Sequence, residues 1–419
     1  MPRPTDRTTA ETLALWGCVV ALCGAAAYVG WSRYAYLQPD VAARGVVATL
    51  GWDAELFASA AERVARTGEA YSTPAGAKPA NGFVSPPLVM AGLGYLHGWF
   101  GVALGPLLKV LHVLAVAIGI GLSVRQFLRP SWAMAAFGAA LFCAGLDGYG
   151  VTTLLAGNVG SIAYVAIFAA LARGVGAGRW GWFHAAVALA TLLKPPFATF
   201  WIVPVLGNGL DWRQARIAGL AAVAPLAAYL GHYALAPELT YAWLRAVQLQ
   251  FEGIGDYGLS VYGATRHAFG LGQASLIPYA AQMTVVLALL ALLLRSKARG
   301  PERLAALVVF AILANPRMKE YDVAYASIPA AAAFLGCLAP SGAGGTRRAA
   351  GVATITLGML LLLKLHRTPY VNYFGVVVVA ALAVVAGSLA PSRGGRLLGE
   401  LAPPAVPGAA RGDERRAAE

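Results

Sequence analysis

The sequence predicts an all-α, polytopic membrane protein built as one bundle of about twelve transmembrane helices. Three observations predict this architecture. Of the 419 residues, 58% are hydrophobic and 12% are charged, whereas a soluble domain carries roughly 25% charged residues. Apolar runs close to the length of a membrane-spanning helix recur along most of the chain. Lys and Arg residues gather on alternate connections between these runs. A water-soluble globular enzyme is thereby excluded.

The first apolar run covers residues 13–31. No small-residue cleavage site follows it, so we interpret it as a retained span and not as a signal peptide. Two later runs meet at Lys194-Pro195-Pro196 and are too short to cross a membrane unless they are tilted or broken. The runs after the first are 105–124, 131–147, 155–172, 180–194, 196–208, 214–234, 276–294, 302–315, 322–339, 347–366 and 370–389.

The positive charges assign the connections to the two sides of the membrane. If the chain alternates between sides, the connections on the side of both termini hold 19 basic and 8 acidic residues, and the others hold 10 basic and 11 acidic residues. Lys and Arg are enriched on the cytoplasmic side, so the sequence predicts a multi-pass protein of the inner (plasma) membrane with both termini cytoplasmic. Most of the net charge of +13 is then a topology signal, and no nucleic-acid partner is expected.

Two outer segments, about 32–105 and 236–273, are longer than a connection requires. In the first, the apolar residues at 56, 57, 60, 61, 64 and 65 share one face, which predicts an amphipathic helix along the membrane surface. The stretch 86–100 begins with a double proline and fits a shallow or re-entrant helix. Residues 1–390 form a single predicted transmembrane domain, and 391–419 is interpreted as a disordered cytoplasmic tail because it is rich in Pro, Gly, Ala and Arg.

Asp53 is the first candidate for chemistry. It stands in Gly51-Trp52-Asp53-Ala54-Glu55, where the predicted surface helix begins. One interpretation makes it a helix N-cap, a common role for aspartate. The other makes it a general base that faces a cavity at membrane level, where partial desolvation raises its basicity. The two roles are compatible.

Lys194 is the second candidate, because a lysine at membrane depth is costly to bury and a helix broken there must line a cavity or pack against protein. The alternative is a lysine that snorkels to the outer interface.

The densest polar cluster between two apolar runs is Asn315-Pro316-Arg317-Met318-Lys319-Glu320-Tyr321-Asp322. Arg317 and Lys319 could bind an anion such as a phosphate, since guanidinium and ammonium groups suit it. Tyr321 and Asp322 could contact a sugar hydroxyl or hold those cations. The alternative is an ordinary polar turn.

Weaker candidates lie elsewhere on the predicted outer face. Asp147 and Asn158 flank a predicted short outer loop, 148–157, although an asparagine inside the membrane can simply bond a neighbouring helix. Arg266 and His267, in the second long segment, could add phosphate contacts. No zinc signature, paired carboxylate motif or phosphate loop occurs, so no metal and no cofactor is expected. The remaining histidines are interpreted as structural: His97, His112, His184, His232 and His366.

Taken together, these features resemble the GT-C superfamily of polytopic glycosyltransferases, and most specifically glycosyltransferase family 87, the polyprenol-phosphate-mannose-dependent mannosyltransferase type. The order and spacing of the motifs cover most of residues 13–390. The motifs that carry the resemblance are Gly51-Trp52-Asp53, Pro86-Pro87, Gly157-Asn158, Lys194-Pro195, Asn315-Pro316-Arg317 and Tyr321-Asp322.

The resemblance implies an inverting, metal-independent glycosyltransferase that acts on the non-cytoplasmic face. It would transfer a sugar, mannose or a related hexose or pentose, from a polyprenyl-phosphate donor to a glycan or glycolipid acceptor of the cell envelope. Asp53 corresponds to the residue proposed as the family's catalytic base. Lys194, Arg317 and Arg266 would then neutralise the leaving phosphate, and the apolar spans would hold the prenyl tail among membrane lipids.

A transporter or lipid-linked sugar flippase is the rival class, because it would also have many spans, a buried lysine and a broken helix. Transporters commonly contain internal repeats with corresponding breaks, and no counterpart of the Lys194 break is found in the other half of the sequence. The long segments on one side also favour an enzyme.

Overall fold

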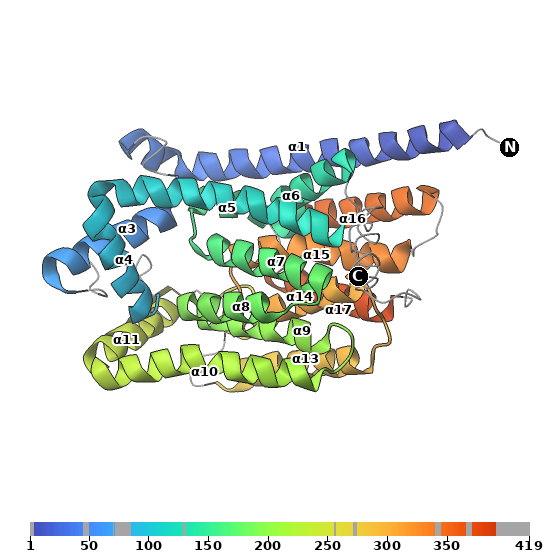
Figure 1. Ribbon diagram of the computed structural model, residues 1–419. Coiled ribbons are helices and arrows are strands. Elements are labelled where there is room, and N and C mark those ends of the chain that lie inside the picture. The colour runs from blue at the N-terminus through green and yellow to red at the C-terminus, as the bar shows by residue number, and fades with distance from the viewer. Residues whose placement is uncertain are drawn as a thin grey trace, which may run out of the picture.

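The computed structural model describes residues 4–44, 50–69, 71, 85–128, 131–254, 257–270, 275–339, 345–365 and 371–390. Most of its longer helices run side by side in one bundle (Figure 1). The described segments contain helices and no β-strand, which confirms the all-α prediction for this part of the chain. The predicted tail, 391–419, and parts of both predicted outer segments lie outside the described residues.

The helices before the break at Lys194 are α1 (Pro4–Arg44), α3 (Trp52–Thr67), α4 (Pro87–Phe100), η2 (Gly101–Ala103), α5 (Leu104–Phe127), α6 (Trp132–Ala156), α7 (Gly160–Ala177) and α8 (Gly181–Leu193). The helices after it are η3 (Pro195–Trp201), α9 (Ile202–Leu206), α10 (Trp212–Leu235), α11 (Pro237–Ile254), α12 (Val261–Phe269), α13 (Ile277–Arg295), α14 (Pro301–Leu313), α15 (Glu320–Leu338), α16 (Gly345–Leu365) and α17 (Val371–Leu389).

The chain is a polytopic α-helical membrane protein by the length and composition of its helices. Within the described residues, eight helical stretches are long and apolar enough to cross a membrane, and the predicted total of twelve spans stays a prediction. Shorter apolar helices occupy Gly181–Leu193, Pro195–Leu206 and Phe374–Leu389. The eight long stretches are Thr12–Ala35, Pro87–Phe127, Trp132–Ala156, Gly160–Ala177, Trp212–Leu235, Ile277–Arg295, Glu320–Leu338 and Gly345–Leu365.

The centre of the bundle is formed by α14 and α15. Every residue of α14 from Glu302 to Leu313 is buried, and α15 packs against α6, α14 and α17. Such a helix can be apolar on all sides, because protein surrounds it. The predicted polar cluster 315–322 connects these two helices, so it is built on the most deeply buried pair in the structure.

The structure corrects the prediction of an outer loop at 148–157. Helix α6 is broken at residues 145–148, where Leu146 and Asp147 have positive φ angles of 46° and 74°, and helical structure then resumes and ends at Ala156. A Cβ on Gly150 would overlap the carbonyl oxygen of Phe142. The absence of a Cβ on Gly150 lets the two parts of α6 touch. Asp147 is therefore a buried residue of a helix kink, and it does not flank a loop.

Helices α3, α4 and α11 gather at one end of the bundle, opposite the end where α1 begins (Figure 1). The predicted amphipathic helix is confirmed as α3, and Glu55 on it pairs with Lys109 of α5 at 2.7 Å. Its apolar face packs on α4 and α5, so this face is covered by protein. The shared core contains Ala54, Phe57, Ala60, Ala61, Met90, Leu93, Leu104 and Leu108.

Candidate functional site

The start of α3 is fixed against the turn between α6 and α7. Gly51, with a φ angle of 76°, donates its backbone N–H to the carbonyl of Leu155 at 2.7 Å. Gly157 has a φ angle of 75°, and a Cβ there would lie 2.7 Å from the Cα of Gly51. Only glycine combines this conformation with so close a backbone approach. The two glycines therefore bring Asp53 and Asn158 together.

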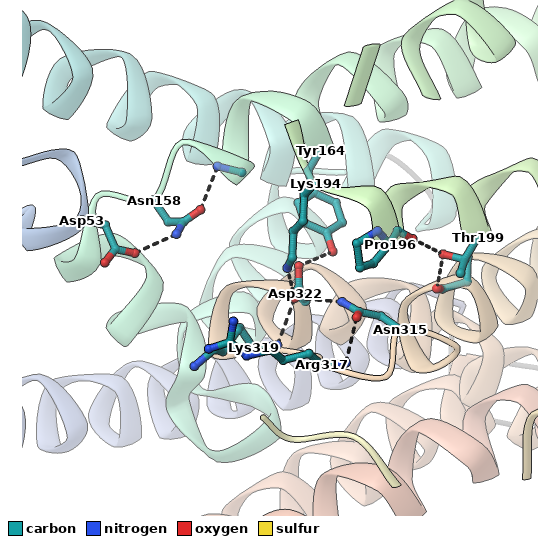
Figure 2. Close-up of polar contacts among 12 residues, drawn as sticks. Asp53, Asn158, Tyr164, Lys194, Pro196, Thr199, Asn315, Arg317, Lys319 and Asp322 are labelled. Atoms are coloured by element: carbon teal, nitrogen blue, oxygen red, sulfur yellow. Dashed lines mark hydrogen bonds and ion pairs between the residues drawn. The ribbon is translucent and has the colours of Figure 1, made fainter. Parts of the chain in front are cut away.

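Asn158 holds Asp53 directly. Its side-chain amide donates to Asp53 Oδ2 at 2.7 Å, and its Oδ1 accepts from the backbone N–H of Gly160 at 2.8 Å (Figure 2). Hydrogen bonds at both its nitrogen and its oxygen thus fix the orientation of the Asn158 amide. Asn158 does bond a neighbouring helix, and its partner there is the candidate base. The N-cap interpretation of Asp53 is wrong, because Gly51 occupies the cap position and α3 has no side-chain cap.

The environment of Asp53 raises the pKa of its carboxyl group from 3.8 to about 6, chiefly because the surrounding protein desolvates it. The hydrogen bond from Asn158 and the positive charge of Lys319 lower the pKa, and the negative charge of Glu320 raises it. The residue stays partly exposed. Asp53 is therefore a carboxylate at neutral pH, with more basicity than an ordinary aspartate.

Lys194 lies at the break between α8 and η3, where its backbone is extended. Its Nζ lies 2.7 Å from Asp322 Oδ2 and 4.7 Å from the centre of the Tyr321 ring. Only 25% of its side chain is exposed. The lysine therefore turns inward to a carboxylate and an aromatic face, and it does not snorkel outward.

Asp322 is the centre of a hydrogen-bond network (Figure 2). Its Oδ2 accepts from Lys194 Nζ, from the backbone N–H of Lys319 at 2.9 Å and from Asn315 Nδ2 at 3.3 Å. Its Oδ1 accepts from the hydroxyl of Tyr164 at 2.9 Å. A buried carboxylate needs such partners to compensate for lost water. Asp322 therefore fixes Lys194 and the 315–319 turn in one arrangement.

Arg317, in the same turn, is held by two hydrogen bonds, one within the turn and one to helix α11. Its backbone N–H donates to Asn315 Oδ1 at 2.9 Å, and its Nη2 donates to Gln250 Oε1 of α11 at 2.6 Å. Helix α11 is part of the layer at this end of the bundle (Figure 1). The turn is therefore held by specific hydrogen bonds and carries two cations, Arg317 and Lys319.

The Asp53 group and the Asp322 group are adjacent. A Cβ on Gly160 would lie 2.8 Å from Asn158 Oδ1 and 3.8 Å from a ring carbon of Tyr321. The charges of Lys319 and Glu320 also act on Asp53. The structure thus brings residues that are far apart in the sequence into a single site.

Arg266 lies in a neighbouring layer of aromatic rings. Its guanidinium stacks over the rings of Tyr257 and Tyr262 at 5.0 and 4.9 Å, and only 3% of the residue is exposed. The segment before α12 joins the turn through the backbone N–H of Leu259, which donates to the carbonyl of Met318 at 2.6 Å. Arg266 is therefore covered by tyrosines behind the turn.

His267 belongs to the same layer, with its ring 5.4 Å from the ring of Tyr257. Asp147 belongs to neither group. Its kink is bordered by Val29 on α1 and by Met359 on α16, whose sulfur accepts from the backbone N–H of Leu146. Of the predicted site residues, Asp147 is thus the one that the structure places away from the candidate site, among packed helices.

Several residues of this site are absent from the predicted set. His112, interpreted as structural, lies with Nδ1 2.9 Å from the carbonyl of Asn158 and Nε2 2.9 Å from the carbonyl of Thr153. It holds the turn that presents Asn158. Tyr164 donates a hydrogen bond to Asp322, and Gln250 accepts one from Arg317. No local motif marks these three residues, because their partners come from distant helices.

A small cavity of about 10 Å³ lies beside Lys194. That volume is close to the minimum that one water molecule needs, so this cavity is too small for a sugar or a phosphate. Among the residues that the structure describes, no three His, Cys, Asp or Glu side chains could hold a metal ion together. The cavity is lined mainly by Tyr164, Lys194, Pro196, Phe197, Thr199, Phe200, Asn315 and Asp322.

Comparison of the chain with protein-family models, curated proteins and solved structures gave no match. The resemblance to glycosyltransferases therefore rests on the sequence motifs alone, and the function that it implies is a proposal.

Proposed function

We propose that the protein is a glycosyltransferase of the GT-C type, similar to family 87, that transfers a sugar from a polyprenyl-phosphate donor on the non-cytoplasmic face. One observation carries the proposal: a partly exposed carboxylate with a raised pKa, Asp53, lies beside a cluster of fixed cations at one end of a membrane bundle. General base catalysis needs the first feature, and a phosphate leaving group needs the second.

Asp53 would accept the proton of an acceptor hydroxyl as that oxygen attacks the anomeric carbon. The bond between the anomeric carbon and the phosphate oxygen breaks, and the electron pair leaves with the polyprenyl phosphate. Attack from the opposite face inverts the configuration through a transition state that resembles an oxocarbenium ion. Asn158 supports this role, because its amide fixes one carboxylate oxygen.

The cations divide into two kinds in this proposal. Lys194 already has Asp322 as its counterion, so its charge is largely compensated before any donor binds. Arg317 and Lys319 belong to the turn at 315–319, and the Nη2 of Arg317 donates to the neutral side-chain amide of Gln250. We therefore assign the donor phosphate chiefly to Arg317 and Lys319, with Lys194 and Tyr321 shaping its boundary. Arg266 and His267 support the turn from behind.

The test is formation of a new glycosidic bond by the purified protein. Radiolabelled polyprenyl-phosphate mannose and a panel of glycan and glycolipid acceptors are supplied in detergent, and products are separated from the donor. The proposal expects label in an acceptor, with inverted anomeric configuration, without added metal. Donor that binds but transfers to no acceptor, water included, would contradict it.

A transporter or lipid-linked sugar flippase is the second candidate. The observation that favours it is the ion pair of Lys194 and Asp322 at a helix break, since ionisable residues within a membrane mark transport pathways. Reconstitution in vesicles separates the classes. A flippase would move the labelled lipid between leaflets without making a new bond, whereas the proposed enzyme would make the bond in detergent.

A further inference from the structure

A second cavity lies at the other end of the bundle, where α13 and α17 end. It has a volume of about 250 Å³, enough for several water molecules and hence for a phosphate group. Helix α14 separates it from the candidate site, because α14 begins after residue 300 and ends before the 315–319 turn. Thirteen helical residues span about 20 Å. The cavity is lined by Leu292, Arg295, Ser296, Lys297, Ala298, Ser388, Leu389 and Ala390.

The backbone carbonyls around this cavity are largely occupied by the protein itself. Buried Arg303 donates to the carbonyls of Leu293 and Ser296 at 3.1 and 3.2 Å. The backbone N–H of Ser296 donates to the carbonyl of Leu292, and its hydroxyl donates to the carbonyl of Ser388. The C-terminal ends of helices usually attract cations through free carbonyls. Here Arg303 and Ser296 already donate to these carbonyls. Attraction by free carbonyls therefore does not account for the two other cations at the cavity, Arg295 and Lys297.

The groups left to face a ligand are hydrogen-bond donors. Arg295 and Lys297 are exposed cations on the wall of the cavity, and among the described residues no carboxylate lines it. Ser388 is only 4% exposed, and its hydroxyl has no hydrogen-bond partner within the part of the chain that the structure describes. A buried hydroxyl without a partner is costly. Two cations and one such hydroxyl together suit the oxygens of a phosphate.

We propose that this cavity binds the phosphate group of an anionic membrane lipid. The apolar walls, Leu292 and Leu389, favour a lipid over a free anion, because acyl chains can continue along them. Basic pockets between membrane helices on the cytoplasmic side are suited to anionic headgroups, and the charge distribution predicts that this end faces the cytoplasm. The site does not depend on the proposed transferase activity.

The experiment measures lipid binding to the purified full-length protein in a neutral detergent by native mass spectrometry. Phosphatidylglycerol is the probe, and phosphatidylcholine and inorganic phosphate are run at matched concentrations. We expect phosphatidylglycerol to bind selectively. The double variant R295Q/K297Q should weaken that binding about tenfold or more, because it removes two charge-assisted contacts. Ser388→Ala, which removes one neutral donor from the lining of the cavity, should weaken that binding about fivefold.

The matched control is R213Q/R216Q, which removes two exposed cations near the start of α10. This control should leave binding within about twofold, since a specific site depends on its own cations and not on net charge. Three results would overturn the proposal. They are equal binding by the wild type and R295Q/K297Q, an equal loss in R213Q/R216Q, and inorganic phosphate bound as tightly as the lipid.

Discussion

Two aspartates in the candidate site illustrate opposite uses of a buried carboxylate. Asp322 accepts hydrogen bonds from four groups, one of them the ammonium of Lys194. Among the described residues, Asp53 accepts one bond, from Asn158, and the pKa of its carboxyl group is raised to about 6. The oxygens of Asp322 are occupied by donors that hold Lys194 and the turn in place. The less compensated carboxylate can accept a proton, so we assign stability to Asp322 and chemistry to Asp53.

The largest expected effect is on catalysis by the variant Asp53→Asn. Loss of a general base lowers turnover by about 10²–10⁴-fold, while an amide of the same shape keeps contact with Asn158. Single-turnover transfer with pre-bound donor measures the loss, and donor affinity should stay within about threefold. Near-normal turnover would remove Asp53 as the base.

Asp322→Asn should lower the free energy of unfolding. It leaves Lys194 without its counterion, and breaking a buried pair costs about 3–5 kcal/mol. Chemical unfolding in mixed micelles measures this loss for the single variant. The double variant Lys194→Met with Asp322→Asn should recover part of the stability, because no unpaired charge remains. Equal stability of the single variant and the wild type would show that the pair is not buried as described.

Arg317→Gln tests which cations hold the donor. Removing one charge-assisted contact should weaken binding of the polyprenyl-phosphate donor about tenfold or more. Binding is measured by equilibrium titration of the labelled donor, with Arg245→Gln on the exposed side of α11 as the control. Unchanged donor affinity in Arg317→Gln would move the phosphate site away from this turn.

The last expected effect is on stability alone, at the junction that brings Asp53 to Asn158. Gly157→Ala forces a Cβ against Gly51 at a positive φ angle and should cost about 1–3 kcal/mol of stability. Gly178→Ala is the control, because its φ angle is 66° but nothing lies within 4 Å of the added Cβ. If both variants lose equal stability, the close approach at Gly157 contributes nothing.

The sequence predicted the helices better than the connections between them. Apolar runs and the face of α3 follow from periodicity, which is local. The prediction of a loop at 148–157 was wrong because a gap between two apolar runs can be a loop or a helix kink, and only tertiary packing decides between them. The same limit applies to the site. Sequence could mark Asp53, Lys194 and Asp322 as costly polar residues, but their pairing depends on contacts across more than 100 positions.

The pH dependence of kcat/KM tests most directly whether Asp53 is the reactive carboxylate. Because the pKa of Asp53 is raised to about 6, its ionised fraction falls about tenfold per pH unit below that value. The wild type should therefore lose activity as the pH falls through 6. Asn158→Ala removes a bond that lowers this pKa, so its acidic limb should lie at higher pH. A wild-type profile that stays flat to pH 4.5, or a limb that Asn158→Ala leaves in place, would contradict the account.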